Sequence, residues 1–152
     1  MANDEQYLRD AIALSARSRN GGNHPFAAMV VDATGAVLAE GVNSFRADCT
    51  GHAELNAVRA AWAARPAQLA GATLYSSAEP CAMCAGAIYW SGISRVVYAL
   101  SEARLLALTG NHPENPTLSL PCRDVFARGQ REVNVIGPLL EDEAAAVHVD
   151  FW

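Results

Sequence analysis

The segment Glu79-Pro80-Cys81-Ala82-Met83-Cys84 opens a predicted helix and places two cysteines three residues apart. This spacing puts both sulfur atoms on one side of the first helical turn. Earlier in the chain, His52-Ala53-Glu54 opens another predicted helix with an imidazole at its first position. If the two helix N-termini meet, one imidazole and two sulfur atoms surround a common point, where the positive ends of both helix dipoles favour thiolates. The sequence thus predicts a metal centre between two helix N-termini.

The donor set indicates which metal this centre holds. One nitrogen and two sulfur ligands with an open fourth position are typical of catalytic zinc, which lowers the pKa of its bound water toward about 7. Glu54 follows His52 by two residues and is placed to take a proton from that water and pass it on. We therefore expect one Zn²⁺ per chain, bound by His52, Cys81 and Cys84, with Glu54 as the catalytic proton carrier.

Two other uses of the cysteines remain open. Cys49-x-x-His52 together with Cys81-x-x-Cys84 has the spacing of a closed, structural zinc site with four ligands. The Cys81-x-x-Cys84 pair alone is compatible with redox chemistry. Glu54 favours the catalytic interpretation, because neither alternative gives this acid a role. Outside such sites, Cys49 and Cys122 are expected to be small buried residues.

The remaining pattern predicts one α/β domain over residues 1–152. Apolar spacing from Tyr7 to Ser15, with Asn3 and Gln6 as a capping box, indicates a first helix that ends at Asn20-Gly21-Gly22. A hairpin and then alternating helices and strands predict a mixed sheet with helices on both faces. The expected strands are 26–31, 36–42, 73–76, 95–100 and 133–136, and the further helices are 52–64, 81–90, 101–108, 123–127 and 139–152. The expected core includes Trp62, Tyr75, Ile88, Tyr89 and Val97.

Composition and charge disfavour several functional classes. Hydrophobic residues make up 51% and charged residues 18% of the 152 residues, which is a globular composition. No apolar run approaches the roughly 20 residues of a membrane-spanning helix, and the acidic first residues lack the apolar region of a secretory signal. The net charge is −5, and the 11 basic residues, all arginine, are scattered along the chain, which disfavours nucleic acid as a partner. We expect a cytoplasmic protein without membrane contact.

Several segments carry a resemblance to a known family. Glu79 to Ile88, Thr50 to Glu54 and Gly41-Val42-Asn43 are similar to motifs of the cytidine-deaminase-like superfamily, in particular its guanine deaminase and tRNA adenosine deaminase branch. Residues 140–151 are similar to the last helix of the tRNA enzymes, so the resemblance covers nearly the whole chain. It implies a three-layer α/β/α fold with a mixed five-stranded sheet. It also implies a homodimer, for which residues 85–90 supply small and aromatic side chains.

The resemblance adds roles for residues outside the metal centre. Asn43 matches a substrate-contacting asparagine, and Phe26 matches a pocket aromatic of the guanine branch. Guanine-specific relatives carry a second acid in the loop after the fourth strand, where this chain has Glu114 in a displaced position. Relatives of that branch close their sites with the chain end, which makes Phe151 and Trp152 candidates for a lid over the substrate. The alternative is that both rings pack on the core as the end of the last helix.

The expected activity is hydrolytic deamination of an amino-substituted nucleobase or nucleoside, a small-molecule substrate, with release of ammonia. Guanine or a related purine is the first expected substrate. Adenosine in tRNA is the runner-up, and cytosine or cytidine is a further candidate. A catalytically silent, zinc-stabilised interaction subunit is the non-enzymatic alternative. Such relatives usually lose the glutamate, so the presence of Glu54 favours an enzyme.

Overall fold

The structure is a computed structural model, and it describes residues 3–152. Its main elements follow the predicted order, with one unpredicted 3-10 helix, η1, between α2 and β3. In chain order they are α1 (Asp4–Asn20), β1 (Ala27–Val31), β2 (Val37–Val42), α2 (Ala53–Ala64), η1 (Pro66–Gly71), β3 (Thr73–Ala78), α3 (Ala82–Ser91), β4 (Arg95–Leu100), α4 (Glu102–Thr109), α5 (Cys122–Ala127), β5 (Asn134–Ile136) and α6 (Glu141–Ala146).

The five strands form one mixed sheet in the order β2-β1-β3-β4-β5. Strand β1 pairs antiparallel with both β2 and β3, whereas β3, β4 and β5 run parallel. The Asp32 carboxylate accepts hydrogen bonds from the backbone N–H groups of Thr34 and Ala36, which fixes the turn of the β1–β2 hairpin. Parallel neighbours need a crossover, and α3 supplies it between β3 and β4. The predicted mixed five-stranded sheet is confirmed.

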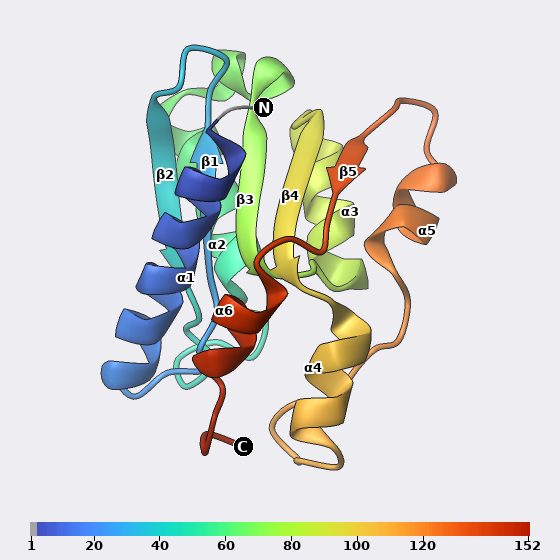
Figure 1. Ribbon diagram of the computed structural model, residues 1–152. Coiled ribbons are helices and arrows are strands. Elements are labelled where there is room, and N and C mark those ends of the chain that lie inside the picture. The colour runs from blue at the N-terminus through green and yellow to red at the C-terminus, as the bar shows by residue number, and fades with distance from the viewer. Residues whose placement is uncertain (1–2) are drawn as a thin grey trace.

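Helices cover both faces of the sheet, as Figure 1 shows with α1 and α6 in front and α2 and α3 behind. Strand β1 illustrates how the sequence builds two cores, because its side chains alternate between the faces. Ala28 and Val30 join the core with α2, α3 and α5. Met29 and Val31 join the core with α1, α4 and α6. The fold is therefore the expected three-layer α/β/α arrangement. No helix in the described part of the chain has the length and apolar character to span a membrane.

Two predictions about single side chains are wrong. Trp62 is 55% exposed, because α2 buries the face that carries Ala57 and Ala61 and turns the indole outward. Cys49 is exposed rather than buried, whereas Cys122 is fully buried as predicted. Of the other expected core residues, full or nearly full burial is found for Tyr75, Ile88 and Val97, and partial burial for Tyr89.

The start of the first helix and the end of the last helix also differ from prediction. At the start, Asn3 makes no side-chain capping bond, and Gln6 donates instead to Asp10. At the end, the predicted helix 139–152 stops after α6. The reason lies in Arg19, whose guanidinium donates to the carbonyl oxygens of Val147 and Val149 at 2.7 and 2.6 Å. These bonds hold the last residues against the end of α1 instead of continuing the helix.

Candidate active site

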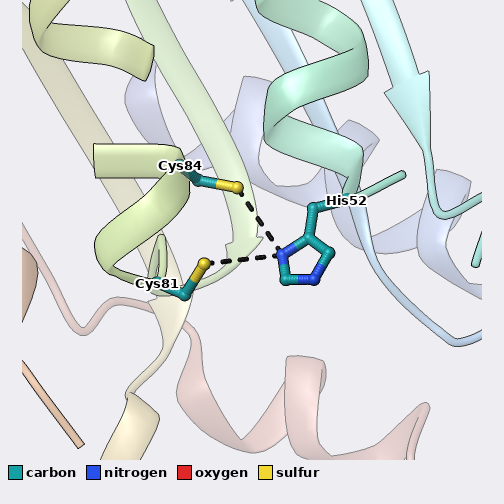
Figure 2. A group of neighbouring side chains, drawn as sticks. All are labelled: His52, Cys81 and Cys84. Atoms are coloured by element: carbon teal, nitrogen blue, oxygen red, sulfur yellow. Dashed lines mark hydrogen bonds between the residues drawn. The ribbon is translucent and has the colours of Figure 1, made fainter. Parts of the chain in front are cut away.

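The predicted ligands meet outside the carboxyl ends of the parallel strands β3 and β4, where α/β sheets usually bind ligands. His52 is the N-cap residue of α2, and Cys81 is the N-cap residue of α3. The His52 Nδ1 atom lies 3.5 Å from the Cys81 sulfur and 3.6 Å from the Cys84 sulfur (Figure 2). Two helix N-termini therefore converge on one point, as the sequence predicts.

The spacing of these three atoms fits zinc. With Zn–S bonds of about 2.3 Å and Zn–N bonds of about 2.05 Å, a tetrahedral ion separates its nitrogen and sulfur ligands by about 3.6 Å. All three ligand atoms lie within 4.8 Å of one another. Among the described residues, Cys49 is not part of this group, so the four-ligand alternative does not form and one coordination position is left for water or substrate.

Hydrogen bonds and burial shift the pKa values of the three ligands in different directions. The Cys84 thiol donates to Cys81, and this bond together with His52 lowers the pKa of Cys81 to about 4 although burial opposes the shift. The same bond to Cys81 and burial raise the pKa of Cys84. The Cys81 thiolate in turn raises the pKa of His52. One sulfur is thus a thiolate at neutral pH, which is the form that binds metal.

Glu54 lies in the first turn of α2 and is only 6% exposed. Burial raises the pKa of Glu54 to about 7, and the neighbouring Cys81 thiolate adds to the shift. The Glu54 carboxyl group is not a member of the three-ligand group. An acid with a pKa near the working pH can both take and return a proton, so its environment suits general acid–base catalysis.

A cleft of about 330 Å³ opens at the ligands His52 and Cys81, and its wall includes four further predicted residues: Glu54, Asn43, Phe26 and Glu114. Asn43 is 3% exposed, and its side-chain oxygen accepts a 2.9 Å hydrogen bond from the backbone of Phe45. This bond fixes the amide so that its NH₂ group remains as the donor. The Phe26 ring packs edge-on against His148, with centroids 5.3 Å apart.

Glu114 and Trp152 have different positions relative to this cleft. Glu114 lies at its rim, where Oε1 is 2.8 Å from Nε2 of the buried His24. Trp152 is not among the residues of the cleft wall. Its indole N–H donates to Nδ1 of His148, and its ring lies edge-on to His24 with centroids 5.0 Å apart. The tail thus packs behind the wall, and a direct contact between Trp152 and substrate stays a prediction.

Sequence reasoning missed two acids beside the ligands, the buried Glu79 and the half-buried Glu102. The Glu79 carboxylate accepts 3.0 Å hydrogen bonds from the backbone N–H groups of Glu102 and Cys122, and so caps α4 and α5 at once. Because Glu79 precedes the Pro80-Cys81 segment, these bonds also fix the metal-binding turn. Glu102 lines the cleft, and burial raises its pKa to about 8. The position of Glu79 before α3 is visible in the sequence, but its hydrogen-bond partners Glu102 and Cys122 lie 23 and 43 residues further along the chain.

The three ligand atoms have the spacing that zinc requires and leave one coordination position free. Together with an acid that titrates near neutral pH, they define a zinc-dependent hydrolase that activates water. Comparison with known sequences narrows this class. The cytidine and deoxycytidylate deaminase zinc-binding region matches residues 1–100, and the chain belongs to this family of zinc-dependent deaminases.

Individual relatives agree on deamination but differ in substrate. The chain is 42% identical over 150 residues to a probable cytosine deaminase of Schizosaccharomyces pombe, covering 98% of this chain and 92% of that protein. It is 44% identical over 101 residues to the guanine deaminase of Bacillus subtilis, covering 64% of each chain. A solved structure in complex with 2,6-diaminopurine is similar with a TM-score of 0.81 at 29% identity, covering 97% of this chain and 80% of that chain.

Proposed function

We propose that the protein hydrolytically deaminates a free amino-substituted nucleobase, replacing a ring C–NH₂ by C=O and releasing ammonia. The observation that carries this proposal is the position of Glu54, a buried acid with a pKa of about 7 beside three zinc-compatible ligands. A zinc ion held by His52, Cys81 and Cys84 supplies a Lewis acid that makes water nucleophilic near neutral pH.

Glu54 carries the protons of this reaction. Its carboxylate takes one proton from the attacking water and delivers it to the ring nitrogen of the base. It then takes the second proton and gives it to the departing amino group, which leaves as ammonia. Burial supports both steps, because it raises the pKa of Glu54 to about 7. Near pH 7 such a carboxyl group can both accept and donate a proton.

Two side chains of the cleft orient the base. The Asn43 amide, fixed through its oxygen by Phe45, offers its NH₂ group to a carbonyl or ring nitrogen of the substrate. The Phe26 ring offers an apolar surface for the flat heterocycle. Both residues come from the ends of neighbouring strands, so the sheet holds them in a fixed relation.

Guanine or a related purine is our first substrate, supported by similarity to a guanine deaminase and to a structure with bound 2,6-diaminopurine. Cytosine is the second candidate, because the similarity to a probable cytosine deaminase covers 98% of the chain. The charge disfavours tRNA. The net charge is −5, and seven of the 11 arginines donate side-chain hydrogen bonds within the protein.

Ammonia release from purified zinc-loaded protein tests this function, with guanine, 2,6-diaminopurine, cytosine, adenine and the corresponding nucleosides as substrates. Glu54→Gln should bind zinc as the wild type does and lose activity by at least about 100-fold, because only proton transfer is removed. Cys84→Ala should lose the metal as well. Glu40→Gln, at an exposed strand position, is the matched control. Wild-type turnover by Glu54→Gln would refute the assigned chemistry, and a silent wild type would support the interaction-subunit alternative.

We further propose that the protein is a homodimer whose interface covers α3. This helix has no charged residue, yet Trp90 is 84% and Met83 is 36% exposed, and Trp62 of α2 is 55% exposed. A helix that is apolar on all sides is normally buried. Light scattering at micromolar concentration should give twice the chain mass. Trp90→Ser should weaken association by at least about tenfold, whereas Val37→Ser on β2 should not. A wild-type mass of one chain would contradict the proposal.

A further inference from the structure

Residues 111–120 form part of the cleft wall but have few bonds to the rest of the protein. This cleft loop contributes Glu114, Asn115, Pro116, Thr117 and Leu118 to the wall. Within the described residues 3–152, one hydrogen bond joins the loop to a distant element, namely the 2.8 Å contact between His24 Nε2 and Glu114 Oε1. The other hydrogen bonds run inside the loop or to the adjoining Thr109.

His24 is a rigid anchor for this bond. Its side chain is 4% exposed and stacks on Phe45 with ring centroids 4.7 Å apart and an angle of 19°. Trp152 packs edge-on against the same imidazole at 5.0 Å. The His24 carbonyl oxygen accepts a hydrogen bond from the buried Ser18 hydroxyl, which fixes the backbone as well. The imidazole therefore has little freedom to follow the loop if the loop moves away.

Glu114 is the exposed half of the pair. Its side chain is 40% exposed, so water can replace His24 as its partner at small cost. Within residues 3–152, the loop makes one aromatic ring contact, which is the edge-on contact between His112 and Trp152 at 5.3 Å. A loop held by a single charge-assisted hydrogen bond and one ring contact can open without disturbing the sheet.

We propose that His24 is a positioning residue that holds the cleft loop closed over the substrate by donating a hydrogen bond from Nε2 to Glu114. The inference rests on the proposed function for its consequence, which is substrate capture. Glu54 and the three metal ligands lie on α2 and α3, outside the loop. Opening the loop therefore weakens binding of the base and leaves proton transfer in place, so KM changes more than kcat.

Hydrogen exchange measured by mass spectrometry tests the closed loop without any substrate. Glu114→Ala removes the acceptor at an exposed position, and His24→Phe removes the donor but keeps an aromatic ring. Each should accelerate exchange in residues 111–120 by about ten- to hundredfold, with little change in the rest of the protein. Glu114→Gln keeps an acceptor and should retain protection. Ser119→Ala, an exposed position in the same loop, is the matched control.

Kinetics on the base that proves to be a substrate complete the test. Glu114→Ala and His24→Phe should raise KM by similar factors, and the double variant should be no worse than either, because both changes break one bond. Unchanged loop exchange in Glu114→Ala overturns the proposal, even if His24→Phe fails to fold. Additive effects on KM also overturn it, since Glu114 would then act on substrate directly. If no base is deaminated, the proposed function fails while loop exchange still decides whether the bond holds the loop.

Discussion

Gly41 lies on β2 where the strand crosses the first turn of α2, and a single methyl group there should disturb the metal centre. A Cβ atom at Gly41 would lie 2.6 Å from the backbone nitrogen of Ala57 and would also overlap the carbonyl oxygen of Ala53. Ala53 stands between His52 and Glu54 in sequence. The substitution Gly41→Ala therefore pushes on the backbone that carries both the proposed zinc ligand His52 and the proposed proton carrier Glu54.

The required movement can be estimated from ordinary contact distances. Non-bonded atoms pack at about 3.5 Å, so the first turn of α2 must retreat by about 1 Å. Metal–ligand distances tolerate about 0.2 Å, and a misplacement of about 1 Å in a catalytic group costs about 100-fold in rate. Overpacking of this kind also destabilises by about 1–3 kcal/mol. We expect zinc affinity to fall at least about tenfold and kcat about 100-fold.

Zinc affinity is measured by competition with a chromophoric chelator, kcat by ammonia release, and the melting temperature by calorimetry. The matched control is Gly71→Ala, because a Cβ atom there meets Ala33 at an ordinary 3.5 Å. The control should match the wild type in zinc affinity and kcat. If Gly41→Ala binds zinc normally and turns over within about twofold of the wild type, α2 is not fixed by its contact with β2, and the reasoning is refuted.

Two further predictions concern the C-terminal segment. Burial lowers the pKa of His148 from 6.5 to about 4, so only the unfolded chain binds a proton in this range. The contribution of His148 to the free energy of unfolding should be fully present above pH 6.5. It should fall on acidification by up to about 1.4 kcal/mol per pH unit, about 3 kcal/mol in total. Urea denaturation of His148→Asn should lack this part of the slope, and an unchanged slope would argue against it. Deletion of Phe151 and Trp152 should lower the melting temperature, because Arg19 loses its ring contact and His24 its edge-on neighbour. If KM rises as well, the tail supports the cleft; an unchanged KM makes it purely structural.

The order of helices and strands could be predicted because its signals are local. Two short, mostly apolar segments, 26–31 and 36–42, with the Asp32 turn between them specify the hairpin before any packing is known. Trp62 was misplaced because helical spacing gives a face but does not say how wide its buried part is. The sheet here packs against small alanines, so the indole at the edge of that face stays in water.

The metal centre was predictable for a related reason, since each ligand occupies the start of a helix and short motifs display the whole donor set. The wall of the cleft is different. His24 and Glu114 are 90 residues apart, and nothing in either segment specifies the other. The end of the helical pattern likewise depends on Arg19, which is 128 residues from the carbonyl of Val147 that it binds. Local chemistry therefore identifies the reaction, whereas the fit of a particular base is set by contacts between distant segments. Short motifs therefore place this chain among the deaminases, whereas the contacts of the loop and the tail with His24 and with each other join residues far apart in the sequence.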